Sequence, residues 1–309
     1  MEKTKQTKSE EAVREERPIV VSTETQRNGR ATPKLSRSPM HGLWALTNRD
    51  LRKWYTNPIQ LFTSLIQPVV WLALFGKALN FGTFISGSGA TVAEQNAIML
   101  NYFGTTSYFS FLACGMLAFV VLFTSAFSGM SVVFDRRFGF LNKALSTPVA
   151  RGAIVMGKVF QSVGRSLIQA AIVLAIAIIL GMEIGHFTVL GVAGAFVIIF
   201  LMATGLSALF TMLALRSSDW QTQVALINLI NLPLLFASNA LFPISIMPNW
   251  LQDVVKVNPV SYANDAVRQL LLGATVHLAP LWVDFAVLIG FALVLSTIGI
   301  VLSWRLLSK

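Results

Sequence analysis

Two long stretches without any charged side chain constrain the fold of this chain most strongly. Residues 95–134 contain no Asp, Glu, Lys or Arg, and residues 166–182 are again uncharged. Between them lies a basic segment, residues 135–151. A helix needs about 20 apolar residues to cross a bilayer core, so both stretches are predicted to span a membrane. A basic loop between two spans is expected on the cytoplasmic side.

The composition places the whole chain in the membrane class. Of its 309 residues, 54% are hydrophobic and only 12% are charged, whereas soluble domains are roughly a quarter charged. The net charge of +10 does not indicate nucleic-acid binding, because most basic residues lie in the amino-terminal tail and in the predicted cytoplasmic loops. The single Cys114 and the scattered His41, His186 and His277 predict no disulfide, metal site or catalytic cluster.

The amino-terminal region divides into a tail and an amphipathic segment. Residues 1–39 are rich in charge and lack apolar periodicity, which predicts a disordered cytoplasmic tail without a cleavable signal. Residues 40–57 place one set of side chains on an apolar helical face and another on a polar face: Leu43, Leu46, Leu51 and Trp54 against Asn48, Arg49, Arg52 and Lys53. We expect an interfacial helix on the inner leaflet, acting either as an electrostatic anchor or as a lever.

Six membrane spans are predicted from the apolar runs. They cover residues 58–79, 105–134, 157–181, 187–215, 220–242 and 281–306. If both termini are cytoplasmic, only Lys77, Lys256 and Arg268 of the 24 Lys and Arg fall outside the cytoplasmic side. The fold class expected is therefore an all-α integral membrane protein whose membrane domain covers residues 40–309.

The basic segment between the second and third spans carries its own pattern. Phe138, Leu141 and Leu145 recur at helical spacing, and Thr147 and Pro148 interrupt the pattern before Arg151. Proline ends a helix because it has no N–H to donate and its ring clashes with the preceding turn. The segment is expected to form one or two turns of amphipathic helix across the ends of the spans.

Two spans carry polar stripes. Lys158, Gln161, Arg165 and Gln169 share one face of the third span; Gln221, Asn228, Asn231 and Ser238 share one face of the fifth, with Asn239 beside it. Exposing Arg165 to lipid would cost about 2.5 kcal/mol or more, so it should face protein or water. Either the amides form interhelical hydrogen bonds, or they line a transport pathway. The candidate pathway residues are Gln161, Arg165, Asn228, Asn231 and Asn239.

The segment after the fifth span predicts two short outer helices. Pro248 suits the first turn of one helix, and Asn258 suits the cap of the second, with Pro259 at its first position. Neither helix is long enough to cross a bilayer. Asp265 and Arg268 are three residues apart and are expected to pair. The segment is either a half-inserted, re-entrant helical hairpin or an ordinary interfacial loop.

Two groups of residues stand out in this order of elements: 135–141, Thr147, Pro148 and Arg151, and later 248–251, 258–259, Tyr262, Asp265 and Arg268. With them, the chain resembles the membrane subunit of ABC-2-type transporters, most of all the daunorubicin-resistance-type drug exporters. The resemblance covers residues 40–309. It implies a cytoplasmic coupling helix that docks on an ATPase subunit, formed by Asp135, Arg136, Arg137, Phe138, Gly139, Leu141, Leu145, Thr147, Pro148 and Arg151. It also implies an outer gate formed by Trp250, Asn258, Pro259, Tyr262, Asp265 and Arg268.

The resemblance further implies a multi-pass plasma-membrane permease that exports a hydrophobic or amphipathic drug or lipid-like substrate. No G-x-x-x-x-G-K-[ST] loop is present, so the chain is expected to be no enzyme and to hold no cofactor; ATP and Mg are expected on a separate ATPase partner. A second permease copy, or a sister permease, is expected to complete the pathway. The family usually has acidic residues where Arg137 and Asn142 stand here, so docking through Phe138, Phe140 and Leu141 is an alternative to a charge pair.

The alternatives are a secondary transporter or a channel without an ATPase. A secondary transporter is expected to carry acidic residues and broken helices at mid-membrane depth. In this sequence Glu183 and Asp284 lie only near the outer ends of spans. A membrane enzyme would need clustered catalytic side chains, which the sequence does not indicate.

Overall fold

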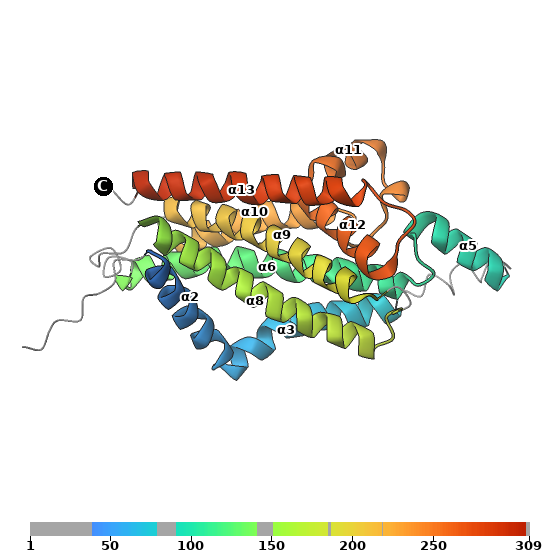
Figure 1. The fold of residues 1–309 in the computed structure, drawn as a ribbon, viewed down its shortest axis with the longest axis horizontal. Coiled ribbons are helices and arrows are strands. Elements are labelled where there is room, and N and C mark those ends of the chain that lie inside the picture. Colours follow the sequence, from blue (N-terminus) through green and yellow to red (C-terminus); the bar gives the residue numbers. More distant parts are fainter. Residues whose placement is uncertain (1–38, 79–90, 141–150, 185–186, 218, 307–309) are drawn as a thin grey trace, which may run out of the picture. The chain divides into compact units, whose positions relative to one another are not determined.

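The structure is a computed structural model that describes residues 39–78, 91–140, 151–184, 187–217 and 219–306 (Figure 1). These residues form helices joined by short turns, and no strand occurs among them. The all-α class predicted from the sequence is therefore confirmed. The predicted tail, residues 1–38, lies outside the described residues.

The described helices differ in length: four have 26 to 30 residues, and the others have 17 or fewer. In chain order they are α2 (Pro39–Tyr55), α3 (Pro58–Ala73), which ends in the π-turn η1 (Leu74–Ala78), α5 (Val92–Phe103), α6 (Tyr108–Arg137), α8 (Arg151–Ile179), α9 (Val189–Arg216), α10 (Trp220–Phe236), the 3₁₀ turn η2 (Ile244–Ile246), α11 (Asn249–Val257), α12 (Pro259–Leu272) and α13 (Leu281–Leu306).

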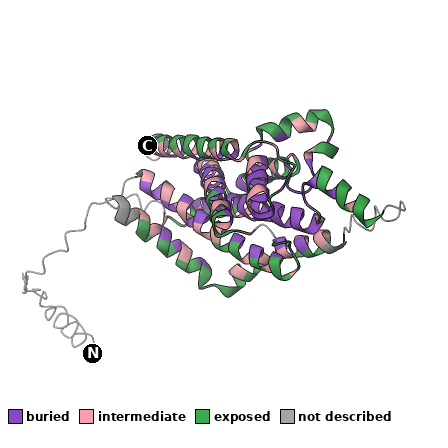
Figure 2. Ribbon diagram, turned by 45° about the vertical axis from the view of Figure 1, so that its right-hand side comes forward, coloured by how far each residue is buried: buried purple, intermediate pink, exposed green. Residues whose placement is uncertain are grey.

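Helix α6 lies at the centre of residues 37–309. It contacts α3, α8, α9, α10 and α12, and it supplies large buried side chains such as Leu112, Met116 and Leu122. Figure 2 shows buried residues on the central helices and exposed ones on α3 and α13. Those exposed faces are apolar, with Phe62 and Leu293 on their surfaces. Such large apolar surfaces are not typical of a soluble domain, and they match a protein surrounded by lipid or by another subunit.

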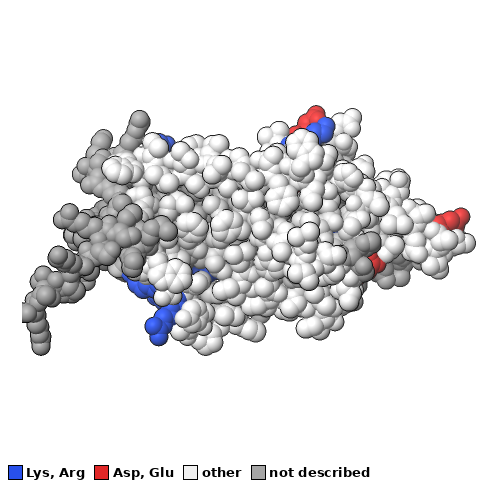
Figure 3. Space-filling view, viewed as in Figure 1, with Lys and Arg blue, Asp and Glu red and all other residues white. Residues whose placement is uncertain are grey.

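The helices alternate in direction, which places their basic residues together. Helices α3, α8 and α10 run away from the end that holds α2, whereas α6, α9 and α13 return to it (Figure 1). We call this end the basic end, because the basic residues of α2, of the last turns of α6 and α9 and of the start of α8 lie there: Arg49, Arg52, Lys53, Arg136, Arg137, Lys158 and Arg216. Figure 3 shows Lys and Arg atoms at this end. Helices α5, α11 and α12 lie at the opposite end, which we call the hairpin end.

Five stretches of the described residues are long and apolar enough to cross a membrane. They are Pro58–Gly76, Val92–Arg137, Gly152–Ile179, Val189–Arg216 and Leu281–Trp304. The fifth predicted span corresponds to α10, which has only 17 residues and contains Pro233 in its last turn. Six full spans are therefore not confirmed. Helix α10 stops before the end of the apolar run 220–242, and the carbonyl oxygens of Leu234 and Ala237 at its end accept from the Asn258 side chain instead of from a further helical turn.

Helix α5 was not predicted. The apolar run before α6 is interrupted at Gly104, which closes α5 with a φ of 70°. A capping box marks the start of α5: Glu94 N–H donates to the Thr91 hydroxyl, and Thr91 N–H donates to the Glu94 carboxylate at 2.7 Å. This Thr-x-x-Glu spacing is the signal from which α5 could have been found.

The segment after α10 forms the two expected short helices, α11 and α12. The Asn258 side chain accepts from Val260 N–H at 3.0 Å, and Pro259 occupies the first position of α12, as expected. Pro248 precedes α11 instead of lying in its first turn. The insertion of this hairpin into a bilayer stays a prediction.

Candidate functional site

A cluster of opposite charges joins three helices at the basic end. The Lys158 ammonium lies 2.6 Å from the Asp50 carboxylate and 2.5 Å from the Asp135 carboxylate. Arg49 lies 2.5 Å from the other oxygen of Asp50. The cluster is largely shielded from solvent, since the Lys158, Asp50 and Asp135 side chains are 12%, 10% and 22% exposed. It ties the last turn of α6 to α2 and α8.

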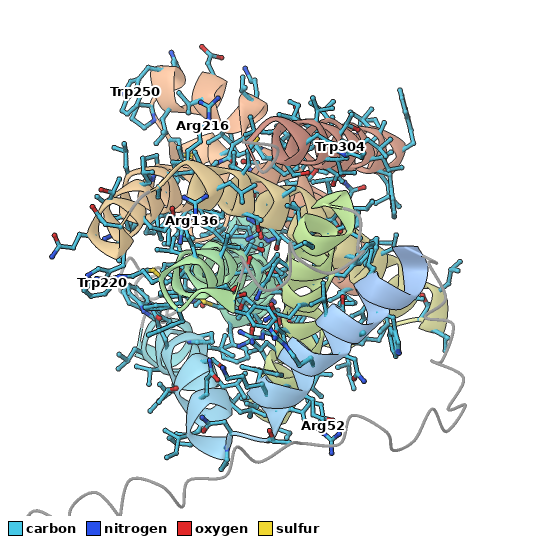
Figure 4. The ribbon with its side chains drawn as sticks, turned by 90° about the vertical axis from the view of Figure 1, so that its left-hand side faces the viewer. Arg52, Arg136, Arg216, Trp220, Trp250 and Trp304 are labelled. Atoms are coloured by element: carbon cyan, nitrogen blue, oxygen red, sulfur yellow. The ribbon has the colours of Figure 1, made fainter. Side chains whose placement is uncertain are left out.

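Helix α2 reaches Lys158 because its apolar face packs on α8. Leu46 lies over Gly157, and Leu51 lies over Gly164. The Thr47 hydroxyl donates to the Gly157 carbonyl at 3.2 Å. The sequence predicts this apolar face on an interfacial helix, and the structure packs the face on α8. Its polar face is exposed, and Arg52 lies at the edge of the basic end (Figure 4).

Arg136 holds the end of α9 to the end of α6. Its guanidinium donates to the carbonyl oxygens of Leu215 at 2.7 Å and Ser217 at 3.1 Å. The last carbonyls of a helix have no partner within the helix, and they carry its negative partial charge. The Arg136 guanidinium donates to these carbonyls, and its positive charge offsets their negative partial charge. Arg136 lies among the helix ends in Figure 4.

The predicted coupling segment is described only in part. Asp135 and Arg136 make the contacts above, Phe138 is 82% exposed, and Gly139 follows with a φ of 70°. Arg137 is exposed. Leu141, Leu145, Thr147 and Pro148 lie outside the described residues, as does the side chain of Arg151 at the start of α8. The helix expected there stays a prediction.

A polar groove of about 580 Å³ lies between α2, α3, α6 and α8. Two of the predicted pathway residues, Gln161 and Arg165, line it. With its amide oxygen turned towards Arg165, Gln161 accepts hydrogen bonds of 2.6 and 2.9 Å from the guanidinium. Arg165 also donates to the Asp50 carbonyl at 3.3 Å and lies 5.7 Å from the centre of the Trp54 ring. Arg165 thus faces protein and an open groove, as the cost of lipid exposure predicts.

The predicted pathway residues of the fifth span lie elsewhere. Asn231 and Asn239 are buried, whereas Asn228 is exposed. Neither oxygen nor nitrogen of the buried Asn231 amide has a hydrogen-bond partner within the described ranges. The structure therefore does not gather the five predicted pathway residues: two line the groove, two asparagines lie within α10, and Asn239 follows it.

At the hairpin end, the predicted pair of Asp265 and Arg268 is wrong. Arg268 donates to the Phe111 carbonyl at 3.2 Å and to the Ala240 carbonyl at 3.0 Å, and its guanidinium lies 3.5 Å from the centre of the Phe111 ring. Both residues are described, and no ion pair joins them within 4.0 Å. Arg268 therefore binds one carbonyl in the first turn of α6 and one that follows the end of α10, in place of the Asp265 carboxylate.

Asp265 binds backbone N–H groups instead. It accepts from Leu278 at 2.7 Å and from Ala279 at 3.1 Å, which anchors the turn before α13. Gln269 bridges Asp265 to Asp284, at 3.1 and 3.0 Å.

The other predicted gate residues surround this core. Asn258 donates to the carbonyls of Leu234 at 2.8 Å and Ala237 at 2.6 Å, which closes the end of α10. The Tyr262 hydroxyl donates to the Lys256 carbonyl at 2.6 Å, and Trp250 is exposed on α11. The structure thus brings most of the predicted gate residues to one end of the helices, held mainly by backbone groups.

Sequence reasoning missed Asp50 as a site residue. It is the only acidic residue of α2, on a helix whose last turn is basic. A lone carboxylate on a basic amphipathic helix is a signal for a cation on a neighbouring element, and Lys158 on the polar stripe of the third span was the available candidate.

The charge cluster predicts a specific pH dependence. Burial raises the pKa of Asp50, but the attraction of Lys158 and Arg49 outweighs it and holds the pKa below its ordinary value near 3.8. Its contribution to stability is present above the ordinary pKa and is lost as pH falls through the lowered one. The melting-temperature difference between wild type and Asp50→Asn should stay constant from about pH 8 to about pH 5 and shrink below about pH 4. A difference that already shrinks near neutral pH would contradict the assignment.

Comparisons with known proteins identify a family pattern over the same region. The model of the family described as ABC-2 type transporter matches residues 41–272, from α2 to α12. A protein of Cyanophora paradoxa named as a transport permease, ycf38, is 32% identical over 74% of this chain and 73% of its own length. A protein of Streptomyces coeruleorubidus named daunorubicin resistance ABC transporter permease protein DrrB1 is 26% identical over 70% of each chain.

Proposed function

The chain belongs to the ABC-2 type transporter family, and on this premise we propose that it is the membrane subunit of an ATP-binding cassette exporter. A separate ATPase subunit binds ATP and Mg, and this subunit moves a hydrophobic or amphipathic substrate out across the cytoplasmic membrane. Two findings support the proposal: the apolar spans of the described residues, and the drug-resistance permeases among the relatives. The sequence itself has no phosphate-binding loop.

One observation carries this proposal: the last turn of α6 is attached to three other helices. Asp135 reaches α2 and α8 through Lys158, and Arg136 reaches the end of α9. A force applied to the segment after residue 137 is therefore passed to the long helices at its start. A loop without such attachments would absorb the force by bending.

The orientation follows from charge. The basic end is cytoplasmic, because Lys and Arg accumulate on that side of membrane proteins. The ATPase then docks at the segment that begins at Asp135. A second copy or a sister permease covers part of the apolar surface, for which the exposed side chains of α3 and α10, including Phe62 and Phe236, are suited.

The direct test is purification of the tagged chain from membranes of its own host. We expect an ATPase with a phosphate-binding loop to co-purify, and we expect the pair, reconstituted in vesicles, to move an amphipathic dye only with ATP. Transport by the purified chain alone would contradict the proposal. The proposal would also be contradicted if host membranes transported the dye normally but no ATPase co-purified with the chain.

Gly139 allows a sharper test of the coupling segment. Its φ of 70° strains any β-branched residue, although no atom lies within 4 Å of the place where a Cβ would stand. Gly139→Val is expected to reduce ATPase stimulation and transport at least about tenfold, since a strain of about 1–3 kcal/mol redirects the chain after α6. Gly139→Asn is the matched control, because asparagine tolerates this conformation. Equal activity of both variants would show that this turn does not position the ATPase contact.

A further inference from the structure

The groove between α2, α3, α6 and α8 has two kinds of wall. One wall is aromatic, formed by Phe119, Phe123, Phe127 and Phe134 of α6. The other wall carries polar and charged groups of α2, α3 and α8, among them Lys53, Gln60, Gln67, Gln161, Arg165 and Gln169. At about 580 Å³, the groove has the size of small-molecule sites in proteins, which have about 300–1,000 Å³.

The charges in the groove do not cancel. Its two carboxylates, Asp50 and Asp135, are paired with Arg49 and Lys158. Arg165 and Lys53 also line the groove, and neither has a carboxylate within 4.0 Å in the part of the chain that the structure describes. The groove therefore carries a positive excess next to an aromatic wall.

Arg165 keeps donors available for a ligand. Its Nε and Nη2 bind Gln161 and the Asp50 carbonyl, which fixes the guanidinium in place. Its Nη1 has no hydrogen-bond partner among the residues described. An Arg that lines a groove and is held in place by neutral groups keeps its positive charge and its Nη1 for a carboxylate or phosphate oxygen.

We propose that this groove binds an anionic amphiphile, with Arg165 and Lys53 contacting its phosphate or carboxylate headgroup and the phenylalanines of α6 contacting its apolar tail. This assignment rests on the proposed export function, for which it names the substrate class. The groove is bordered by exposed side chains of α3 and α6, including Thr63 and Phe127, so an amphiphile can enter from the side. A free anion without an apolar part would gain nothing from contact with the aromatic wall.

Binding to the chain alone tests the site without the ATPase. The purified chain is placed in phosphatidylcholine nanodiscs, and a fluorescent lysophosphatidic acid is titrated while its anisotropy is followed. Lysophosphatidylcholine with the same tail and fluorophore reports the tail alone, and inorganic phosphate added as a competitor reports the headgroup alone. We expect saturable binding of the acid, weaker binding of the choline ester, and no displacement by phosphate.

Two arginine variants give the matched comparison. Arg165→Gln is expected to weaken binding of lysophosphatidic acid about tenfold, as the loss of a charge-assisted hydrogen bond implies, and Arg165→Lys should retain part of it. Arg52→Gln removes the same charge from the exposed face of α2, outside the groove, and should leave binding unchanged. If Arg165→Gln fails to fold, Lys53→Gln carries the test, because Lys53 is exposed and its loss leaves the fold intact.

Three results would overturn the assignment: equal binding of the two lipids, displacement by inorganic phosphate, or the same loss in Arg52→Gln as in Arg165→Gln. None of them bears on whether an ATPase drives this subunit. Conversely, binding as expected in nanodiscs, together with the failure of any ATPase to co-purify with the chain from host membranes that transport normally, would support the site and contradict the proposed export function.

Discussion

Replacing Lys158 by methionine is expected to lower the free energy of unfolding by about 3–5 kcal/mol, the cost of removing one partner from a buried ion pair. Asp50 and Asp135 would then face each other without the ammonium that lies 2.6 and 2.5 Å from them. Their repulsion should separate α2 from the end of α6, so ATPase stimulation should be lost together with stability. Denaturant titration of the detergent-purified protein measures the first effect, and ATPase assays with the partner measure the second.

The control for this variant is Lys256→Met on α11. Lys256 also pairs with a carboxylate, that of Asp253 at 3.0 Å, but its side chain is 57% exposed and that of Asp253 is 76% exposed. Exposed pairs contribute at most about 1 kcal/mol, so this variant should resemble wild type. Adding Asp50→Asn and Asp135→Asn to Lys158→Met should restore part of the stability. No recovery in the triple variant would mean that the charges are not the cause.

Replacing Gly115 by alanine is expected to destabilise the protein by about 1–3 kcal/mol, as overpacking does, although alanine is the better helix former by about 1 kcal/mol. An added Cβ would lie 2.1 Å from the Ala240 carbonyl oxygen, a backbone atom that no side-chain rotation can remove. The same oxygen accepts from Arg268, so the clash also loosens the contact between α6 and α12. A lower melting temperature and faster proteolysis at residues 237–248 would be the measured result.

Gly290 on α13 provides the matched control. No atom lies within 4 Å of the place where its Cβ would stand. Gly290→Ala should therefore stabilise α13 slightly, by up to about 1 kcal/mol. If both alanine variants were stabilised equally, the close approach of Ala240 to α6 would not exist in the folded protein.

The sequence was most informative where a pattern is local. The apolar runs predicted where α8, α9 and α13 lie, because the need to satisfy backbone groups in a bilayer acts on every residue of a span. The cap of α12 could be predicted from Asn258 and Pro259, because both effects act within one helical turn. The apolar face of α2 was likewise visible at helical spacing.

Contacts between distant residues could not be predicted in this way. Asp50 and Lys158 are 108 residues apart, and nothing in the sequence states that α2 lies on α8. Spacing along a helix paired Arg268 with Asp265, whereas its partners are carbonyls of two other segments, Phe111 in α6 and Ala240 after α10. The end of α10 likewise depends on a distant residue, because its last carbonyls accept from Asn258, which lies 21 and 24 residues further along the chain.

Asn258 restricts how α10 can move. The amide nitrogen of Asn258 donates to the carbonyls of Leu234 and Ala237, while its amide oxygen accepts from Val260 N–H and caps α12. Sliding α10 along its axis by a single residue, about 1.5 Å, would lengthen both short bonds at once. Tilting about the amide leaves them intact, so in a working cycle α10 would swing about this pivot and not travel as a piston.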